Sequence, residues 1–531
     1  MKKTAFEGGG FVSGVFLLSL STLIVKIIGL AFKIPMLSLL GMEGMGYFNS
    51  AYEIYAVLCV IATAGLPVAL SILISSARAK RDTLSVRGVY GAAIKIFLIF
   101  GLLGTLLMML FASELADVIG NPEARFCVFA IAPALLFICI ASAIRGYCQG
   151  FEDMRPTAIS QLIEALSKLS LGIVFAMIGI KKGLLISEIA ALSVLGITIG
   201  TLLSALYLCI VKRRRKIEIF EKIDSKKRKY TGTLLKIALP ITLGSALMSF
   251  TRVLDMGLIM RRLQDVGVSQ LKATEIYGAY ATLALPVFSL IPSLIAPISM
   301  ALIPELAGCI ERKNATGQTR SVEKSLRLTS VLAMPASIAV MLFSSQILSL
   351  LFSGQNDAID IAAPLLSLLG ASILLSCLIT TTNAILQAYR RVGLPIFSMA
   401  IGVFVKALTT YFLLGVKGVG ALGAPVGSLA CGVSVVLLNF AFIIKYTKNI
   451  ESALKVGRIF LKPLLASVTS VGVAYALFSV LESKSVSDTL AFGIVALVAV
   501  VLYGFFVFLF TLLDREDLRM IPVLGKMIKD K

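Results

Sequence analysis

Residues 23–36 read LIVKIIGLAFKIPM, an apolar run interrupted by two lysines, Lys26 and Lys33. The run belongs to a longer apolar segment, residues 11–40, which can cross the roughly 30 Å hydrocarbon core of a bilayer as a helix. Because the lysines are seven residues apart, about two helical turns, they lie on one face of that helix. A charge at the centre of a bilayer costs at least about 3 kcal/mol. This face is therefore expected to meet water, acidic side chains or an anionic ligand.

Apolar segments of this length recur along the whole chain. The 531 residues are 58% hydrophobic and 15% charged, and the mean hydropathy is +0.95. These values are typical of multi-span membrane proteins and leave no room for a soluble domain of any size. The first segment is too long for a signal peptide, so we expect it to be retained as a span. We predict an all-α integral membrane protein with 14 transmembrane helices, at residues 11–40, 46–76, 88–111, 123–150, 156–180, 184–211, 233–260, 274–307, 322–344, 357–389, 392–414, 418–444, 456–481 and 488–513.

Lysine and arginine concentrate in every second connector between these spans. If both termini are cytoplasmic, the inside segments hold about 33 of these residues and the outside segments about 8, as the positive-inside rule requires. An odd number of spans would destroy this alternation. The formal charge of +21 therefore reflects membrane orientation and does not indicate nucleic-acid binding. We expect a multi-pass protein of the plasma membrane, acting as a monomer.

The residue types that are missing exclude several kinds of chemistry. The chain has no histidine, which removes Ser-His-Asp and Cys-His catalysis, His-ligated zinc and His proton relays. Its eight cysteines are scattered, with no CxxC pair, and are expected to be small apolar residues within spans. We therefore expect no enzymatic activity, no metal site and no cofactor.

Two shifts within the sequence indicate an internal repeat. At a shift of 238 residues Lys168 falls on Lys406, and at a shift of 230 residues Pro67 falls on Pro297. Both shifts superpose spans in the same order, so the repeat is expected to be parallel, with a pseudo-twofold axis along the membrane normal. The predicted parts are an N-lobe (1–211, spans one to six), a basic cytoplasmic linker (212–232), a C-lobe (233–444, spans seven to twelve), spans 13 and 14 (445–513) and a cytoplasmic tail (514–531).

Charged residues inside the predicted spans are the candidate binding residues. Lys26, Lys33 and Arg252 are expected to form a cationic cluster at similar depth, with Glu53 and Asp255 as its acids or as ion-coupling groups. The cluster would be positive overall, and a water-filled cavity between the two lobes would lower its desolvation cost and attract anions. The alternative is that these residues form ion pairs between packed helices, and the i, i+3 spacing of Arg252 and Asp255 allows such a pair within one helix.

Five further polar residues are secondary candidates, each with a structural alternative. Arg145 and Gln149 lie one turn apart near the inner end of the fourth span, where snorkelling to the interface competes with function. Glu164 and Lys168 are spaced i, i+4 in the order that favours a pair within one helix, so a structural role is favoured for them. Lys406 occupies the position that repeats Lys168.

The eighth predicted span contains several prolines. Pro286, Pro292 and Pro297 each remove a backbone hydrogen bond and are expected to kink or loosen the helix. Such helices survive in membranes where neighbours or water satisfy the freed carbonyl groups. We interpret the three prolines as a candidate hinge for alternating access, although prolines are common in membrane helices.

Several long stretches resemble one known family. Residues 26–71, KIIGLAFKIPMLSLLGMEGMGYFNSAYEIYAVLCVIATAGLPVALS, closely resemble the stage V sporulation protein B group of polysaccharide flippases. That group belongs to the multidrug/oligosaccharidyl-lipid/polysaccharide exporter superfamily, which includes the lipid II flippases. The same resemblance is seen in RGYCQGFEDMRPTAISQLIEAL (145–166), ITLGSALMSFTRVLDMGLIMRRLQ (241–264) and YGAYATLALPVFSLIPSLIAPISMALIPELA (277–307).

The resemblance implies a transporter with two six-helix lobes and a cavity lined largely by spans one, two, seven and eight. It also implies that cationic cavity residues engage a pyrophosphate and that spans 13 and 14 form a groove for a polyprenyl tail. Lys26 and Lys33 stand where relatives commonly carry arginine, which keeps the charge but loses the planar fork suited to phosphate. The stretch before Pro286 reads AYATLAL, where lipid II flippases tend to carry an Arg and a Glu.

The function expected is that of a flippase. It would move a polyprenyl-pyrophosphate-linked sugar precursor, lipid II or a related cell-wall or polysaccharide intermediate, from the inner to the outer leaflet, with Na+ or H+ as a coupling ion. A second hypothesis is a cation-coupled drug or metabolite antiporter on the same fold, but such a cavity should be dominated by acids and aromatics. A third is a membrane scaffold for envelope assembly that transports nothing, in which the charges could be neutralised without consequence.

Overall fold

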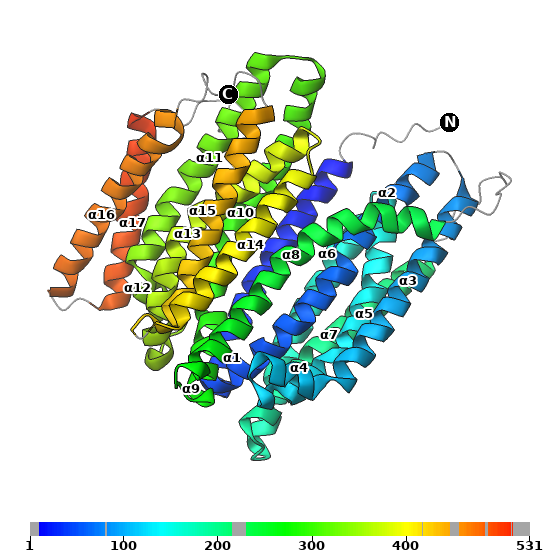
Figure 1. Ribbon diagram of the computed structural model, residues 1–531, viewed down its shortest axis with the longest axis horizontal. Coiled ribbons are helices and arrows are strands. Elements are labelled where there is room, and N and C mark those ends of the chain that lie inside the picture. Colours follow the sequence, from blue (N-terminus) through cyan, green and yellow to red (C-terminus); the bar gives the residue numbers. More distant parts are fainter. Residues whose placement is uncertain are drawn as a thin grey trace. The chain divides into compact units, whose positions relative to one another are not determined.

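The computed structural model describes residues 10–79, 82–214, 230–416, 418–446, 456–483, 487–510 and 512. Within these ranges the chain forms helices and turns and contains no strand, which confirms the all-α fold class (Figure 1). Most of the predicted linker 212–232 and the whole predicted tail 514–531 lie outside the described residues.

The chain divides into two compact units, the first ending at Gly278 and the second beginning at Ala279. The helices of the first unit are α1 (Gly10–Thr63), α2 (Gly65–Ala79), α3 (Thr83–Leu110), α4 (Ala112–Ile119), α5 (Arg125–Gly150), α6 (Arg155–Lys181), α7 (Ile186–Arg214), α8 (Tyr230–Asp265) and α9 (Gln270–Ala279). After Ala279, the last residue of α9, the second unit contains a π-helix (Tyr280–Ala284) and then α10 (Leu285–Glu311), α11 (Ala315–Leu342), α12 (Ser344–Leu351), α13 (Asn356–Ala388), α14 (Gly393–Leu414), α15 (Gly423–Tyr446), α16 (Lys462–Ser483) and α17 (Asp488–Leu509).

Thirteen helical stretches among the described residues are long and apolar enough to cross a membrane. Twelve of them overlap one predicted span each, from Ser85–Leu110 to Leu490–Leu509. The first, Leu20–Arg78, is 59 residues long and covers the first two predicted spans together. The chain is thus a multi-pass membrane protein, while 14 crossings and the pseudo-twofold relation of two six-helix lobes remain predictions.

The long first stretch folds back on itself at Gly41. The backbone there has φ 65° and ψ −174°, a conformation essentially restricted to glycine. The rings of Phe32 and Phe48 have centroids 5.7 Å apart, whereas sixteen residues of straight helix would separate them by about 24 Å. Helix α1 therefore consists of a first arm, residues 10–40, and a second arm, residues 42–63, that run back along each other (Figure 1).

Helix α8 packs in the first unit, against α1 and α2. Gly65 of α2 lies so close to the carbonyl of Ala238 that a Cβ atom at this position would clash. At the other end of α8, Nε2 of Gln264 donates to the carbonyl of Gly120 at 2.8 Å. The first unit therefore extends beyond the predicted N-lobe, because hydropathy marks where α8 lies in the sequence but carries no information on which helices it contacts.

Helix α13 forms the centre of the second unit, where it packs against α10, α11 and α15. The buried hydroxyl group of Thr381 in α13 lies 3.1 Å from that of Ser299 and 2.7 Å from that of Thr329. Helices α16 and α17 lie side by side (Figure 1), and the buried Phe343 ring contacts the ring of Phe492 in α17. These contacts join the last two predicted spans to the rest of the second unit.

Candidate functional site

Three helical segments of the first unit carry the predicted cationic cluster. Lys26 and Lys33 lie on the first arm of α1, Glu53 lies on its second arm, and Arg252 and Asp255 lie on α8. The reversal of α1 brings its two arms together, and α8 packs against α1. The structure therefore assembles in one region all five residues that the sequence separates into three predicted spans.

An ion pair joins α1 to α8 within the cluster. Nη1 of Arg252 lies 3.9 Å from Oε1 of Glu53, whose side chain is 10% exposed, while the side chain of Arg252 is 48% exposed. Lys33 is close enough to be attracted by Glu53 and repelled by Arg252. Lys26 is also repelled by Arg252. Asp255 is 4% exposed, and its negative charge repels that of Glu53. With three cations and two acids, the cluster is positive overall and favours an anionic ligand.

Glu53 also carries a buried oxygen that lacks a hydrogen bond. Its Oε2 atom has no hydrogen-bond partner among the residues that the structure describes, and Arg252 approaches the other oxygen only to 3.9 Å, beyond hydrogen-bond distance. A buried carboxylate oxygen in this state is costly unless a proton, a water molecule or a cation satisfies it. Within the cluster, Glu53 is therefore well suited to take up a proton or a small cation.

Arg145 lies in a buried polar network between α5, α6 and α7. Its Nη2 donates to Oε2 of Glu164 at 2.9 Å and to Oγ of Ser204 at 3.0 Å, and its Nε donates to Oγ of Ser160 at 2.9 Å. The Arg145 side chain is 12% exposed. Snorkelling, which the sequence leaves open, does not describe this side chain, because its guanidinium binds three partners on two neighbouring helices.

The ammonium group of Lys168 is surrounded by aromatic rings from both arms of α1. Its Nζ lies 5.0 Å from the ring centre of Phe32, 5.7 Å from that of Phe48 and 4.7 Å from that of Tyr52. An ammonium over the faces of aromatic rings gains cation–π energy, most strongly where water is excluded. We call these three rings the aromatic cage. It ties α6 to the two arms that carry Lys33 and Glu53.

Two residues that have a possible partner on their own helix form an ion pair with a different helix. The spacing favours a Glu164–Lys168 pair, whereas Glu164 forms its ion pair with Arg145 of another helix and Lys168 lies in the aromatic cage. Arg252, which the spacing allows to pair with Asp255, lies 3.9 Å from Glu53 on α1. An i, i+3 or i, i+4 spacing shows only that two side chains can meet. Packing decides which partner is nearer.

The remaining two candidates lie on α5 and α14. Gln149 is half-buried one turn after Arg145 in α5. Lys406 is half-buried in α14 of the second unit. Among the described residues there is no group of three or more His, Cys, Asp and Glu side chains that could hold a metal ion.

The predicted hinge segment contains one irregular turn. The π-helix Tyr280–Ala284 ends two residues before Pro286. Proline has no N–H to donate, and its ring would clash with the carbonyl four residues earlier in an α-helix. Helix α10 then continues without a break through Pro292 and Pro297. The irregular backbone thus lies before the first proline rather than at each of them.

Sequence reasoning missed the residues that surround the charged groups. The three rings of the cage and the two serines beside Arg145 are residue types that occur throughout membrane spans. A signal existed for two of them, since Phe32 and Tyr52 directly precede Lys33 and Glu53 in the sequence. Hydropathy alone gives these rings no special meaning.

Two family models match the chain. The model described as polysaccharide biosynthesis protein matches residues 11–308, more than half of the chain, and the model described as MatE matches residues 240–412. The two matches overlap and together extend over both compact units.

Individual proteins are similar over nearly the whole length. Stage V sporulation protein B of Bacillus subtilis (strain 168) is 24% identical over 98% of this chain and 99% of that protein. Lipid II flippase MurJ of the same organism is 23% identical, with 87% of each chain covered. A solved structure of lipid II flippase MurJ in an inward closed conformation has a TM-score of 0.70 at 17% identity, covering 93% of this chain and 98% of that chain. This last likeness shows a shared fold.

Proposed function

We propose, from the premise that this chain belongs to the polysaccharide biosynthesis protein family within the multidrug/oligosaccharidyl-lipid/polysaccharide exporter superfamily, that it is a flippase for an anionic lipid-linked sugar. The substrate class is a polyprenyl-pyrophosphate-linked precursor, lipid II or a related cell-wall or polysaccharide intermediate. Transport runs from the inner to the outer leaflet of the plasma membrane by alternating access, with both termini cytoplasmic and the protein acting as a monomer. The relatives named stage V sporulation protein B and lipid II flippase support this substrate class.

The half-exposed guanidinium of Arg252 carries the proposal. It lies within the membrane-spanning stretch Tyr230–Asp265, where contact with lipid would be costly for a charge. A side chain that is 48% exposed there is expected to meet water or a polar ligand. Because cations outnumber acids around it, that ligand is expected to be an anion, and a pyrophosphate is the anionic part of the proposed substrate.

Each charged residue of the cluster has a distinct proposed role. The ammonium groups of Lys26 and Lys33 bind phosphate oxygens as point charges, while the Arg252 fork can bind two oxygens at once. Glu53 holds Arg252 when the substrate is absent and gives it up when phosphate oxygens compete. A coupling cation, Na+ or H+, would bind at Oε2 of Glu53, the buried oxygen without a hydrogen bond among the described residues, with Asp255 nearby as a second acid.

Alternating access also needs a helix that can bend. The π-helix before Pro286 is a candidate, since π-turns interrupt the regular hydrogen-bond ladder and often occur at functional sites. Pro292 and Pro297 weaken the ladder further along α10. For the lipid tail, the exposed apolar side chains of α16 and α17, which include Leu465 and Phe505, offer a surface within the membrane.

The decisive test is complementation of a flippase-depleted strain by variants that reach the membrane in normal amounts. The double variant Lys26→Ala, Lys33→Ala is expected to fail, and the matched variant Lys26→Arg, Lys33→Arg, which keeps both charges, is expected to support growth. Reconstitution with defined lipid-linked donors, followed by an outer-leaflet accessibility assay, identifies the substrate. Full rescue by the alanine variant would refute the role of the cluster.

A cation-coupled drug or metabolite antiporter is the second candidate. The match of residues 240–412 to the MatE model favours it, whereas the positive balance of the cluster argues against an organic cation as substrate. Overexpression that confers resistance to cationic dyes, without any effect on lipid-linked precursors, would support this alternative. A scaffold that transports nothing is the third, and it predicts growth even when every charge of the cluster is neutralised.

A further inference from the structure

A cavity of about 600 Å³ lies between α3 and the first turn of α8, within the first unit. Its wall includes Gly91 and Lys95 of α3 and Tyr230 and Gly232 of α8. The volume falls in the range of sites for small molecules or headgroups, about 300–1,000 Å³. Gly232 and Arg252 are twenty residues apart on α8, about 30 Å along the helix, so this cavity is separate from the cationic cluster.

Contacts at one end of the cavity fix the distance between the two helices. The Tyr230 hydroxyl lies 3.1 Å from the hydroxyl of Ser85, whose backbone N–H donates to Asp82 at 2.9 Å. Gly88 lies against the Tyr230 ring so closely that a Cβ atom would clash with it. One turn further on, a Cβ added at Gly91 or at Gly232 would meet no atom within 4 Å. The helices therefore touch at Tyr230 and leave open space beside it.

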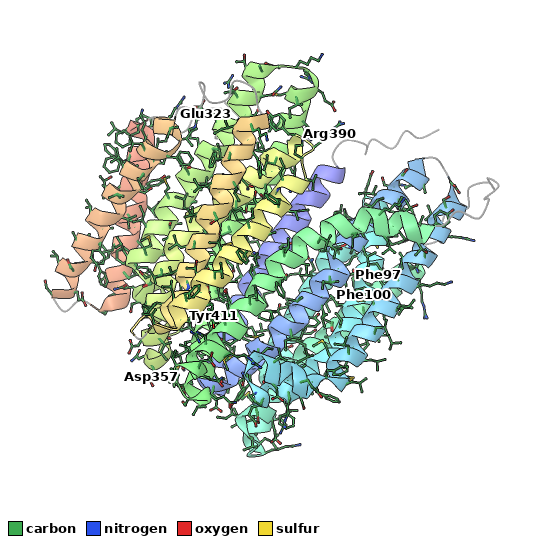
Figure 2. The ribbon with its side chains drawn as sticks, viewed as in Figure 1. Phe97, Phe100, Glu323, Asp357, Arg390 and Tyr411 are labelled. Atoms are coloured by element: carbon green, nitrogen blue, oxygen red, sulfur yellow. The ribbon has the colours of Figure 1, made fainter. Side chains whose placement is uncertain are left out.

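Two stripes of exposed apolar side chains begin at this cavity. On α3 the stripe consists of residues at helical spacing after Lys95, namely Ile99, Leu102 and Leu106, which are 59%, 50% and 45% exposed. On α8 it consists of Leu235, Leu239 and Leu243, which are 47%, 60% and 53% exposed. On the opposite side of α3 Phe97 is buried, at 0% exposed, whereas Phe100, three residues further along the helix, is 42% exposed. Figure 2 labels both residues on α3. The cavity thus opens on the lipid-facing side of the first unit.

Two exposed lysines lie at this end of the helices. Lys95 lies exposed in the cavity wall, and Lys236 follows Gly232 by one turn on the same side of α8 and is also exposed. Lysine side chains at this depth attract anionic headgroups by about 1 kcal/mol each. The basic connectors before α3 and α8 assign this end of the helices to the cytoplasmic leaflet under the positive-inside rule.

We propose that this cavity binds the phosphodiester headgroup of an anionic phospholipid from the inner leaflet, with the acyl chains along the two apolar stripes. Lys95 neutralises the phosphate, and the side-chain-free surfaces of Gly91 and Gly232 leave room for the headgroup. The exposed apolar side chains of the two stripes on α3 and α8 then contact the acyl chains of the bound lipid. The site goes beyond the proposed function, because this lipid stays on the protein and is not its cargo.

The test measures lipid retained by the intact chain, by native mass spectrometry after incubation with phosphatidylglycerol or phosphatidylcholine. The wild type is expected to retain one phosphatidylglycerol with several-fold preference over phosphatidylcholine. Lys95→Gln should weaken this binding by about fivefold, which corresponds to one lysine at a membrane surface. Gly91→Leu should weaken it as much or more without changing any charge, since a Cβ atom there meets no atom within 4 Å and the rest of the side chain takes up space in the cavity.

Two controls separate this site from general electrostatics and from transport. Lys182→Gln removes an exposed cation at the end of α6 and should leave retention unchanged. Lys26→Ala, Lys33→Ala should also retain the lipid, so failure of the proposed function would leave this result intact. The proposal is overturned if Gly91→Leu retains phosphatidylglycerol as well as the wild type does, or if Lys182→Gln lowers this retention as much as Lys95→Gln. Displacement of the phosphatidylglycerol by millimolar inorganic phosphate would also overturn it.

Discussion

The ammonium nitrogen of Lys168 lies 4.7 Å from the centre of the Tyr52 ring, and the residue after Tyr52 is Glu53. A cation on α6 thus holds the turn of α1 that supplies an acid to the cationic cluster. The same ammonium lies over the ring of Phe32, which directly precedes Lys33. Lys168 therefore contacts the neighbours of both a predicted cation and a predicted acid, and fixes the spacing between the two arms of α1.

Replacing Lys168 tests how much of this packing depends on volume and how much on charge. Lys168→Ala is expected to destabilise the protein by about 2–4 kcal/mol, because it leaves a cavity among three rings. Lys168→Met keeps most of the volume and removes a buried charge together with its cation–π energy, so its cost is expected to be smaller. Thermal unfolding in detergent measures both. Equal losses of stability in the two variants would show that the charge, not the volume, matters in the cage.

Removing one partner of the Arg145–Glu164 ion pair is expected to destabilise the protein, whereas replacing both partners by apolar residues is expected to cost little. Glu164→Ala leaves Arg145 buried with only serine partners and should cost about 1–3 kcal/mol. The double variant Arg145→Met, Glu164→Leu removes both charges and should recover most of that loss, since apolar residues often replace a buried pair without net cost. A double-mutant cycle on thermal stability measures the coupling. A double variant as unstable as the sum of the single ones would contradict this account.

A side chain at Gly41 is expected to destabilise the protein, whereas a side chain at Gly29 in the same helix is expected to be tolerated. Gly41→Ala forces a Cβ into a backbone conformation with φ 65° and ψ −174°, at a cost of about 1–3 kcal/mol. Gly29→Ala lies in regular helix with open space around the new atom, and should be neutral or stabilising by up to about 1 kcal/mol. Both are measured by thermal unfolding. Similar stabilities would mean that the reversal of α1 does not depend on glycine.

The apolar length of each segment was enough to predict the fold class and the approximate ranges of the helices. Such lengths depend only on bilayer thickness and residue hydropathy, which are local properties. They also placed Lys26, Lys33, Glu53, Arg252 and Asp255 inside spans, and the structure brings these five residues together. Their shared role in binding stays a prediction.

The contacts between helices could not be predicted from a single sequence. Whether Glu164 pairs with Lys168 or with Arg145 depends on how α5 packs against α6, which no spacing along one helix reveals. The aromatic cage has the same origin, since its rings come from the two arms of a helix that reverses. Hydropathy predicts the reversal only as a break between two spans, while the backbone angles of Gly41 show how it is made.

The last prediction concerns the fork of Arg252. Arg252→Gln is expected to slow appearance of a lipid-linked donor in the outer leaflet by at least about tenfold, because a charge-assisted contact to phosphate is worth roughly 1.5–3 kcal/mol. Arg252→Lys keeps the charge but loses the two-oxygen geometry, so its effect should be intermediate. Arg262→Gln is the matched control, since Arg262 lies on the same helix and pairs with Asp265 at 3.4 Å. Equal transport by Arg252→Gln and Arg262→Gln in reconstituted vesicles would remove Arg252 from the substrate site.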